Sequence, residues 1–95
     1  MKTTDFKLWD VFQDGMTSKL SVVVLIDNTH VHVISDKPSI YALKIHEQEV
    51  CYEVVDIKPE VVFDGFKAKM KGQYEQKVFN KALDDYNQRF KLLMI

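Results

Sequence analysis

The clearest hydrophobic pattern in the chain has the period of β-strands and begins at residue 20. Residues 20–27 and 29–35 are rich in β-branched side chains, and Asn28 between them favours a turn, so the two segments predict a hairpin. The first arm contains an uninterrupted apolar run over residues 22–26. Such a run is typical of a strand that is covered on both faces or central in its sheet.

Two further segments, residues 40–46 and 50–57, alternate in the same way after short polar breaks. Since connections this short exclude parallel pairing, the four segments predict a four-stranded antiparallel meander. If the strand order follows the chain, residues 20–27 and 50–57 are the outer strands, and each leaves an open sheet edge.

After residue 57 the apolar period changes to that of a helix. Pro59 fits the first turn of a helix, and Gly72 interrupts the pattern that follows. Beyond Gly72, apolar residues recur at spacings of three and four, as in a helix that lies on a core. These residues are Phe79, Ala82, Leu83, Tyr86, Phe90 and Leu93.

Residues 5–14 fit two different elements. The spacing of Phe6, Trp9 and Phe12 favours a short helix, with Gly15 placed just after its end. The alternation at Trp9 and Val11 is instead that of a strand, which is the competing prediction. With the helix preferred, the sequence predicts a two-layer α+β domain. A C-terminal helical segment covers the four-stranded sheet, and a short N-terminal helix precedes it.

The composition describes one ordinary globular domain over residues 1–95. With 46% hydrophobic and 28% charged residues, it excludes intrinsic disorder and low complexity. The lone cysteine, Cys51, allows no internal disulfide and favours a reducing, cytoplasmic environment. The start shows no apolar signal-peptide region, and no apolar run is long enough to span a bilayer, so no membrane partner is expected. Arg89 is the sole arginine beside 12 lysines, which hints at an AT-rich bacterial or phage genome.

The nearest approach to a chemical site is the pair His30 and His32, which a strand would project to one face about 7 Å apart. His46 is the candidate third metal ligand, but no acidic ligand follows at a recognisable spacing. Cys51 lies in an apolar strand pattern and is interpreted as a packing residue. No phosphate-binding glycine loop is present. We therefore expect no enzyme, no catalytic residue, no cofactor and no metal, with a small metal-binding protein as an alternative.

Charge divides unevenly along the chain. Residues 1–57 hold nine acidic against five basic residues, and residues 58–95 hold eight basic against five acidic ones. The basic positions of the helical part include Lys67, Lys69, Lys71, Lys77 and Lys81. They support the alternative of a weak nucleic-acid-binding accessory protein. Specific nucleic-acid readout usually recruits arginine, so we expect nucleic acid not to be the partner.

Two surfaces are candidates for binding another protein. The first is an acidic line along the last predicted strand and the turn before it, with a tyrosine as anchor. Its residues are Glu47, Glu49, Tyr52, Glu53 and Asp56. The second is the apolar end of the last helix, which covers all sides of that helix end and predicts a homodimer interface. Its residues are Phe90, Leu92, Leu93, Met94 and Ile95. The sequence thus predicts a non-catalytic protein–protein interaction module, such as a small inhibitor or regulator.

Overall fold

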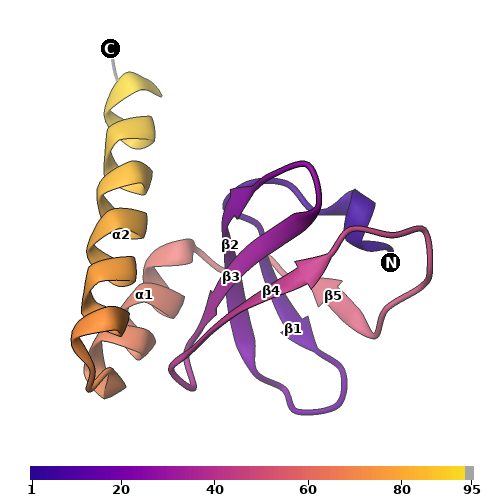
Figure 1. Ribbon diagram of the computed structural model, residues 1–95, viewed down its shortest axis with the longest axis horizontal. Coiled ribbons are helices and arrows are strands. Elements are labelled where there is room, and N and C mark those ends of the chain that lie inside the picture. The colour runs from indigo at the N-terminus through magenta and orange to yellow at the C-terminus, as the bar shows by residue number, and fades with distance from the viewer. Residues whose placement is uncertain (94–95) are drawn as a thin grey trace.

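The protein is an α+β domain, in a computed structural model that describes the backbone of residues 1–93 and the side chains of residues 1–89 (Figure 1). A five-stranded antiparallel sheet carries two helices on one side. The strands are β1 (Val11–Asp14), β2 (Leu20–Ile26), β3 (His30–Ser35), β4 (Ser39–Lys44) and β5 (Tyr52–Val54). The helices are a 3₁₀ turn, η1 (Thr3–Asp5), followed by α1 (Pro59–Lys69) and α2 (Gln73–Leu93). None of the helices in this described part combines the length and apolarity needed to cross a membrane.

The sheet order is β4-β3-β2-β1-β5, so β1 to β4 form a meander and the chain then crosses to place β5 beside β1. The predicted hairpin is confirmed as β2 and β3. The predicted count of four strands is wrong, and so is the outer position of residues 20–27, because β1 pairs with the free side of β2. The last predicted strand is shorter than expected. It is an outer strand as predicted, although its partner is β1.

The helix predicted over residues 5–14 is wrong: the short N-terminal helix of the protein is the 3₁₀ turn η1, and the competing strand is observed over β1. In a helix Phe6, Trp9 and Phe12 would share one side. In the sheet, Phe6 and Phe12 pack on one face and Trp9 packs on the other. Gly15 does not end a helix but lies in the turn after β1. Its N–H donates to the Cys51 carbonyl at 2.7 Å, and an added Cβ would lie only 2.9 Å from that oxygen.

Two apolar clusters cover the two faces of the sheet. One lies between the sheet and the helices and includes Val22 and Phe66, whereas the other lies on the opposite face and includes Phe12 and Val23. The consecutive residues Val22 and Val23 are both fully buried, yet they belong to different clusters. This arrangement explains the uninterrupted apolar run of β2, because both of its faces face a core.

Helix α1 packs against β2 and β3, and α2 packs against α1. The predicted helix start at Pro59 and the break at Gly72 are both confirmed. The Glu75 carboxylate accepts the N–H groups of Lys71 and Gly72 at 2.9 and 3.3 Å, which caps the start of α2 and lowers the pKa of Glu75. At a rise of 1.5 Å per residue, α2 is about 31 Å long. Its C-terminal half extends beyond α1 (Figure 1).

Candidate functional site

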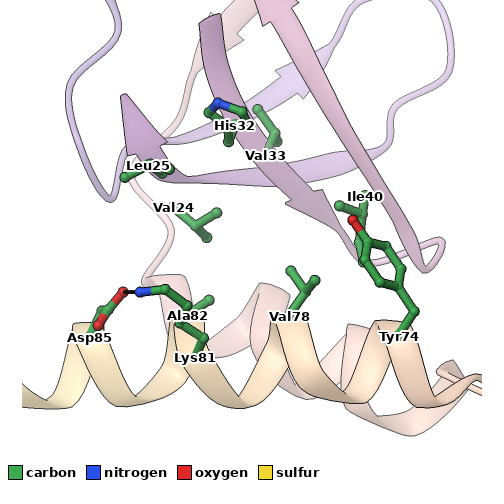
Figure 2. A pocket seen from close by; sticks show the side chains of 10 residues that line it. All are labelled: Val24, Leu25, His32, Val33, Ile40, Tyr74, Val78, Lys81, Ala82 and Asp85. Carbon is green, nitrogen blue, oxygen red and sulfur yellow. Dashed lines mark hydrogen bonds and ion pairs between the residues drawn. The ribbon is translucent and has the colours of Figure 1, made fainter. Parts of the chain in front are cut away.

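A groove runs between α2 and the part of the sheet formed by β2, β3 and β4 (Figure 2). Its volume is about 200 Å³, and its walls are mostly aliphatic. The sheet contributes Val24, Leu25, His32, Val33 and Ile40, and the helix contributes Tyr74, Val78, Lys81, Ala82 and Asp85. We call this surface the α2 groove.

The sheet wall of the groove exists because β2 continues beyond its pairing with β1. Beyond the β1–β2 pairing, the last hydrogen bonds on this side of β2 are made by Val23, whose N–H donates to Asp10 and whose carbonyl accepts from Trp9, both just before β1. In the described chain no strand pairs with residues 24–26 on that side, and a bulge between Val23 and Leu25 shifts their register against β3. The outcome is an exposed apolar strand end, with Leu25 53% and Ile26 39% exposed.

A second cavity, of about 450 Å³, adjoins the groove on the other side of residues 24–26. It shares Val24, Leu25 and Asp85 with the α2 groove, so the two cavities form one continuous surface. Trp9 and Arg89 also line this second cavity.

Aromatic rings connect α2 to Trp9, just before β1, and to α1. The Trp9 ring meets the edge of Tyr86 on α2 with ring centroids 5.1 Å apart, and it lies 6.4 Å from the Phe63 ring of α1. The Tyr86 hydroxyl donates to the Glu60 carboxylate. Burial, together with that carboxylate, raises the pKa of Tyr86 to about 12, so the phenol stays neutral at physiological pH. The aromatic cluster that Trp9 forms beside this surface is therefore uncharged.

The charged groups around the groove are already paired within the chain. Lys81 Nζ lies 3.1 Å from Asp85 Oδ2 on the helix, and His32 Nε2 lies 2.7 Å from Asp27 Oδ2 at the end of β2. The bond to His32 and the backbone N–H groups of Thr29 and His30 hold the pKa of the Asp27 carboxyl well below its usual range. The groove thus presents apolar surface with little net charge at its rim.

The two histidines of β3, His30 and His32, both make hydrogen bonds near the β2–β3 turn. Their ring centroids are 6.3 Å apart, but His32 bonds to Asp27, and His30 Nδ1 bonds to Thr29 Oγ1 at 2.8 Å. His46 lies elsewhere, where its backbone N–H donates to the hydroxyl of Thr3. Among the described residues, no three His, Cys, Asp or Glu side chains gather as a metal site would require.

The predicted acidic edge is divided between two environments. Glu49 accepts the α-ammonium group of Met1 at 2.5 Å, and Glu47 lies 3.5 Å from Lys2 Nζ. Lys2 and Glu49 also form a β-bridge, so the N-terminal segment lies along this turn. These two carboxylates are therefore engaged by the chain itself.

The remaining members of the acidic edge lie on β5 and just after it. Glu53 and Asp56 are exposed. Tyr52 is half-buried, with its ring centroid 5.1 Å from Phe12 and 6.3 Å from Phe6. Burial is the main cause of a raised pKa at Tyr52. Its ring belongs to the core cluster on that face, so the acidic edge lacks a protruding aromatic anchor.

The predicted lysines are exposed, and one lysine joins them that the sequence did not single out. Lys37 in the β3–β4 turn lines a shallow cavity of about 620 Å³ together with Lys69 and Lys71 at the α1–α2 junction. Lys67 and Lys77 are also exposed, and Lys81 pairs with Asp85.

Cys51 is exposed, so its prediction as a buried packing residue is wrong. The strand expected there begins only at Tyr52, and Cys51 lies in the bend before it. The predicted dimer residues cannot be placed by their contacts. The side chains of Phe90, Leu92 and Leu93 lie outside the described part of α2, and Met94 and Ile95 lie outside the described residues altogether.

Sequence reasoning missed the groove because its exposed residues belong to elements whose patterns predict burial. Leu25 and Ile26 end an apolar run that is longer than the pairing of β2 with β1, and this mismatch is the one signal that could have revealed them. Tyr74 is 70% exposed at the other end of the groove, although its spacing to Val78 is helical. Comparisons with protein-family models, curated proteins and solved structures find no match to this chain.

Proposed function

We propose that this protein is a non-catalytic interaction module that binds an apolar segment of a protein in the α2 groove. The observation that carries the proposal is the continuous apolar surface on which Leu25, Ile26 and Tyr74 stay exposed. At the rim of the α2 groove, Lys81 pairs with Asp85 and His32 with Asp27. Leaving large apolar side chains in water is unfavourable by about 25 cal/mol per Å², and contiguous apolar patches commonly mark binding sites.

The role that fits such a module is that of a small inhibitor or regulator in the cytoplasm of a bacterium or of a phage-infected cell. The lone cysteine supports a reducing compartment, and the excess of lysine over arginine supports an AT-rich genome. A small domain of 95 residues with an exposed apolar groove is suited to binding a partner protein and blocking part of that partner's surface.

The acidic edge, which the sequence suggested, is a weaker candidate for binding a partner than the α2 groove. Glu47 and Glu49 already hold the N-terminal segment, and Tyr52 is packed into the core. A partner at this edge would have to bind mainly through Glu53 and Asp56, which are exposed charges of modest energetic value.

The test compares two exposed apolar residues. Leu25→Asp places a charge in the groove, whereas Met16→Asp changes an 83% exposed residue in the β1–β2 turn and is the matched control. Partners are captured from a lysate of the source organism with each immobilised protein, and the dissociation constant is then measured with the purified partner. We expect Leu25→Asp to weaken binding at least tenfold and Met16→Asp to leave it unchanged. Equal affinity of the two variants would exclude the groove as the binding surface.

A second candidate function, weak nucleic-acid binding, is supported by one observation, the gathering of Lys37, Lys69 and Lys71 around one cavity. Each neutralised phosphate would steepen the salt dependence by close to one unit of log K per log salt. We expect binding of arbitrary duplex or single strands to be lost near physiological salt. Fluorescence anisotropy that still gives a micromolar dissociation constant at about 150 mM salt would promote this function above the first.

A further inference from the structure

The outer edge of β4 is the longest open strand edge in the described part of the chain. β4 has six residues and lies at one end of the sheet, whereas β5 at the other end has three. Natural edge strands are usually blunted by charge, proline, a bulge or a covering element. β4 carries one charge, Lys44, and its pairing with β3 is regular. This edge is therefore well suited to pair with another strand.

The backbone groups that β4 directs outward follow from its pairing with β3. The Ile45 N–H, one residue beyond β4, donates to the Thr29 carbonyl at 2.9 Å. Because bonded and non-bonded pairs alternate along an antiparallel ladder, every second residue back from Ile45 also bonds to β3. The residues between them direct their N–H and C=O groups away from the sheet, and in the described chain no strand or loop bonds to these groups. They are Ile40, Ala42 and Lys44.

Both ends of this open stretch are closed. At one end Pro38 precedes β4 and has no N–H to donate. At the other end His46 is the next outward residue, and the Thr3 hydroxyl already accepts its N–H at 2.8 Å and donates to its carbonyl at 3.2 Å. The open stretch is therefore limited to three outward residues, with Ala42 at its centre.

A second copy of β4 uses all of these groups in one register. If two β4 strands pair antiparallel about a two-fold axis at Ala42, the two Ala42 residues lie opposite each other, and Ile40 lies opposite Lys44 of the other copy. All three pairs are then bonded pairs. Sliding one strand by two residues loses one of these pairs, and sliding it by one residue loses all of them. The same register places Pro38 opposite His46, so the two closed ends coincide.

The side chains at this edge are compatible with the same register. Ile40 and Tyr74 line the same end of the α2 groove (Figure 2), and Tyr74 is 70% exposed. Lys44 of the second copy, opposite Ile40, reaches the Tyr74 ring and forms an attractive cation–π contact there. Beyond the paired strands, Lys37 in the β3–β4 turn lies level with Glu47 of the other copy, whose side chain is 78% exposed. Opposite charges therefore meet at both ends of the pair.

We propose that the protein forms a two-fold symmetric dimer in which the β4 edges of two copies pair about Ala42 and join their sheets into one. The occupant is a second copy because one axis brings together all the open backbone groups, both closed ends, and the opposite charges of Lys37 and Glu47. The interface is this sheet edge and not the apolar helix end that the sequence suggested. The dimer goes beyond the proposed function, since residues 24–26 of β2 lie two strands away from the edge.

Sedimentation velocity of the full chain over about 1–200 µM tests for the dimer. We expect a species of twice 11.1 kDa at the upper concentrations. Ala42→Pro should weaken association about 30-fold or more, because proline removes the central N–H and blocks the edge, whereas in the monomer that N–H has no partner. Val54→Pro is the matched control on β5. The N–H of Val54 also points outward, because that of Val55 donates to Val11, and this change should leave association unaltered.

Opposite charges at the axis test the register. Position 42 faces itself in the dimer, so Ala42→Glu and Ala42→Lys each place two like charges opposite each other and should each weaken association about tenfold. An equimolar mixture of the two variants should form a mixed dimer that is about tenfold or more tighter than either variant alone. Ala42 is exposed, so both variants should fold, and circular dichroism checks this. The mixture stays decisive even if Ala42→Pro does not fold.

Amide hydrogen exchange locates the interface directly. The N–H groups of Ile40, Ala42 and Lys44 should become protected as the protein concentration rises, whereas that of Val54 should not. Two results would overturn the dimer: a monomer at about 200 µM, or a dimer whose affinity is the same in Ala42→Pro and in both charge variants. Neither result affects the α2 groove, which Leu25→Asp tests separately.

Discussion

At position 9, glycine should give a more stable protein than alanine, whereas alanine is the more stabilising of the two residues at most positions. Trp9 has a φ of 71°, in the left-handed region where bulky side chains are rare. Its N–H donates to the Val23 carbonyl at 2.9 Å, and the Val23 N–H donates to the Asp10 carbonyl at 3.0 Å. Trp9 and Asp10, the two residues just before β1, thus both bond to Val23 of β2. This is the hydrogen-bond pattern of a β-bulge whose first position normally holds glycine.

The magnitudes follow from what each variant removes. Both lose the half-buried indole and its contacts with Tyr86 and Phe63, which should cost about 2–3 kcal/mol, below the 3–5 kcal/mol of a fully buried ring. Alanine keeps a left-handed penalty of about 1–2 kcal/mol, whereas glycine has none. Glycine loses about 0.5–1 kcal/mol through the greater freedom of its unfolded chain. Trp9→Gly should therefore be more stable than Trp9→Ala by about 0.5–1 kcal/mol.

Urea unfolding followed by far-ultraviolet circular dichroism measures the difference, since the variants lack the sole tryptophan as a fluorophore. Val61 on α1 is the control position, because it is 52% exposed in a regular helix. There the order should be the ordinary one, with Val61→Gly less stable than Val61→Ala by about 1 kcal/mol. If Trp9→Ala proves as stable as Trp9→Gly or more so, the strained bulge is not a feature of the folded protein.

Three further predictions concern other residues of the fold. Gly65→Ala should lower the unfolding free energy by about 1–3 kcal/mol in thermal melts, because its Cβ would lie 2.9 Å from the Cβ of Asp36; a more stable variant would show that α1 can move away. Ser18→Gly should raise the unfolding free energy by up to about 1 kcal/mol, because it relieves a φ of 58° in an exposed turn; thermal melts that show no rise in melting temperature would contradict that conformation. The folded-state pKa of Asp27 is depressed, so the stability it contributes is present above pH ~4 and is lost as the pH falls toward the folded-state value. Urea titrations from pH 5 to 2 should thus show a shallower loss for Asp27→Asn than for the natural chain, and parallel curves would refute the linkage.

The sequence predicted those parts of the fold whose local pattern and tertiary environment agree. The β2–β3 hairpin follows from β-branched arms around a turn, and both helices follow from Pro59, Gly72 and a stripe of apolar residues. In each case the residues that decide the element lie next to one another along the chain, so local propensity and burial favour the same structure.

The N-terminal strand could not be predicted because its partners are distant in the sequence. The spacing of Phe6, Trp9 and Phe12 matches a helix only if all three side chains face one core. The protein has two cores on opposite sides of the sheet, and these three residues divide between them. The same ambiguity concealed the position of β5, which crosses the domain to pair with β1 rather than with its neighbour in the chain.

Sequence reasoning missed the candidate site for a related reason. The exposed end of β2 results from where its backbone pairing stops, and no local sequence motif marks that point. Sequence gives the length of an apolar run but not the length of the chain that pairs with it. Here backbone pairing on the β1 side ends at Val23, while β2 continues to Ile26. The residue that ends the pairing is Trp9, whose left-handed backbone turns the chain away from β2 and whose ring braces α2 through Tyr86. Bulges are frequent beside functional sites because they redirect a strand at a defined point. The strain at Trp9 and the exposure of Leu25 are in this sense one structural feature, because the left-handed turn at Trp9 leaves the strand end at residues 24–26 without a partner strand on the side of the second cavity.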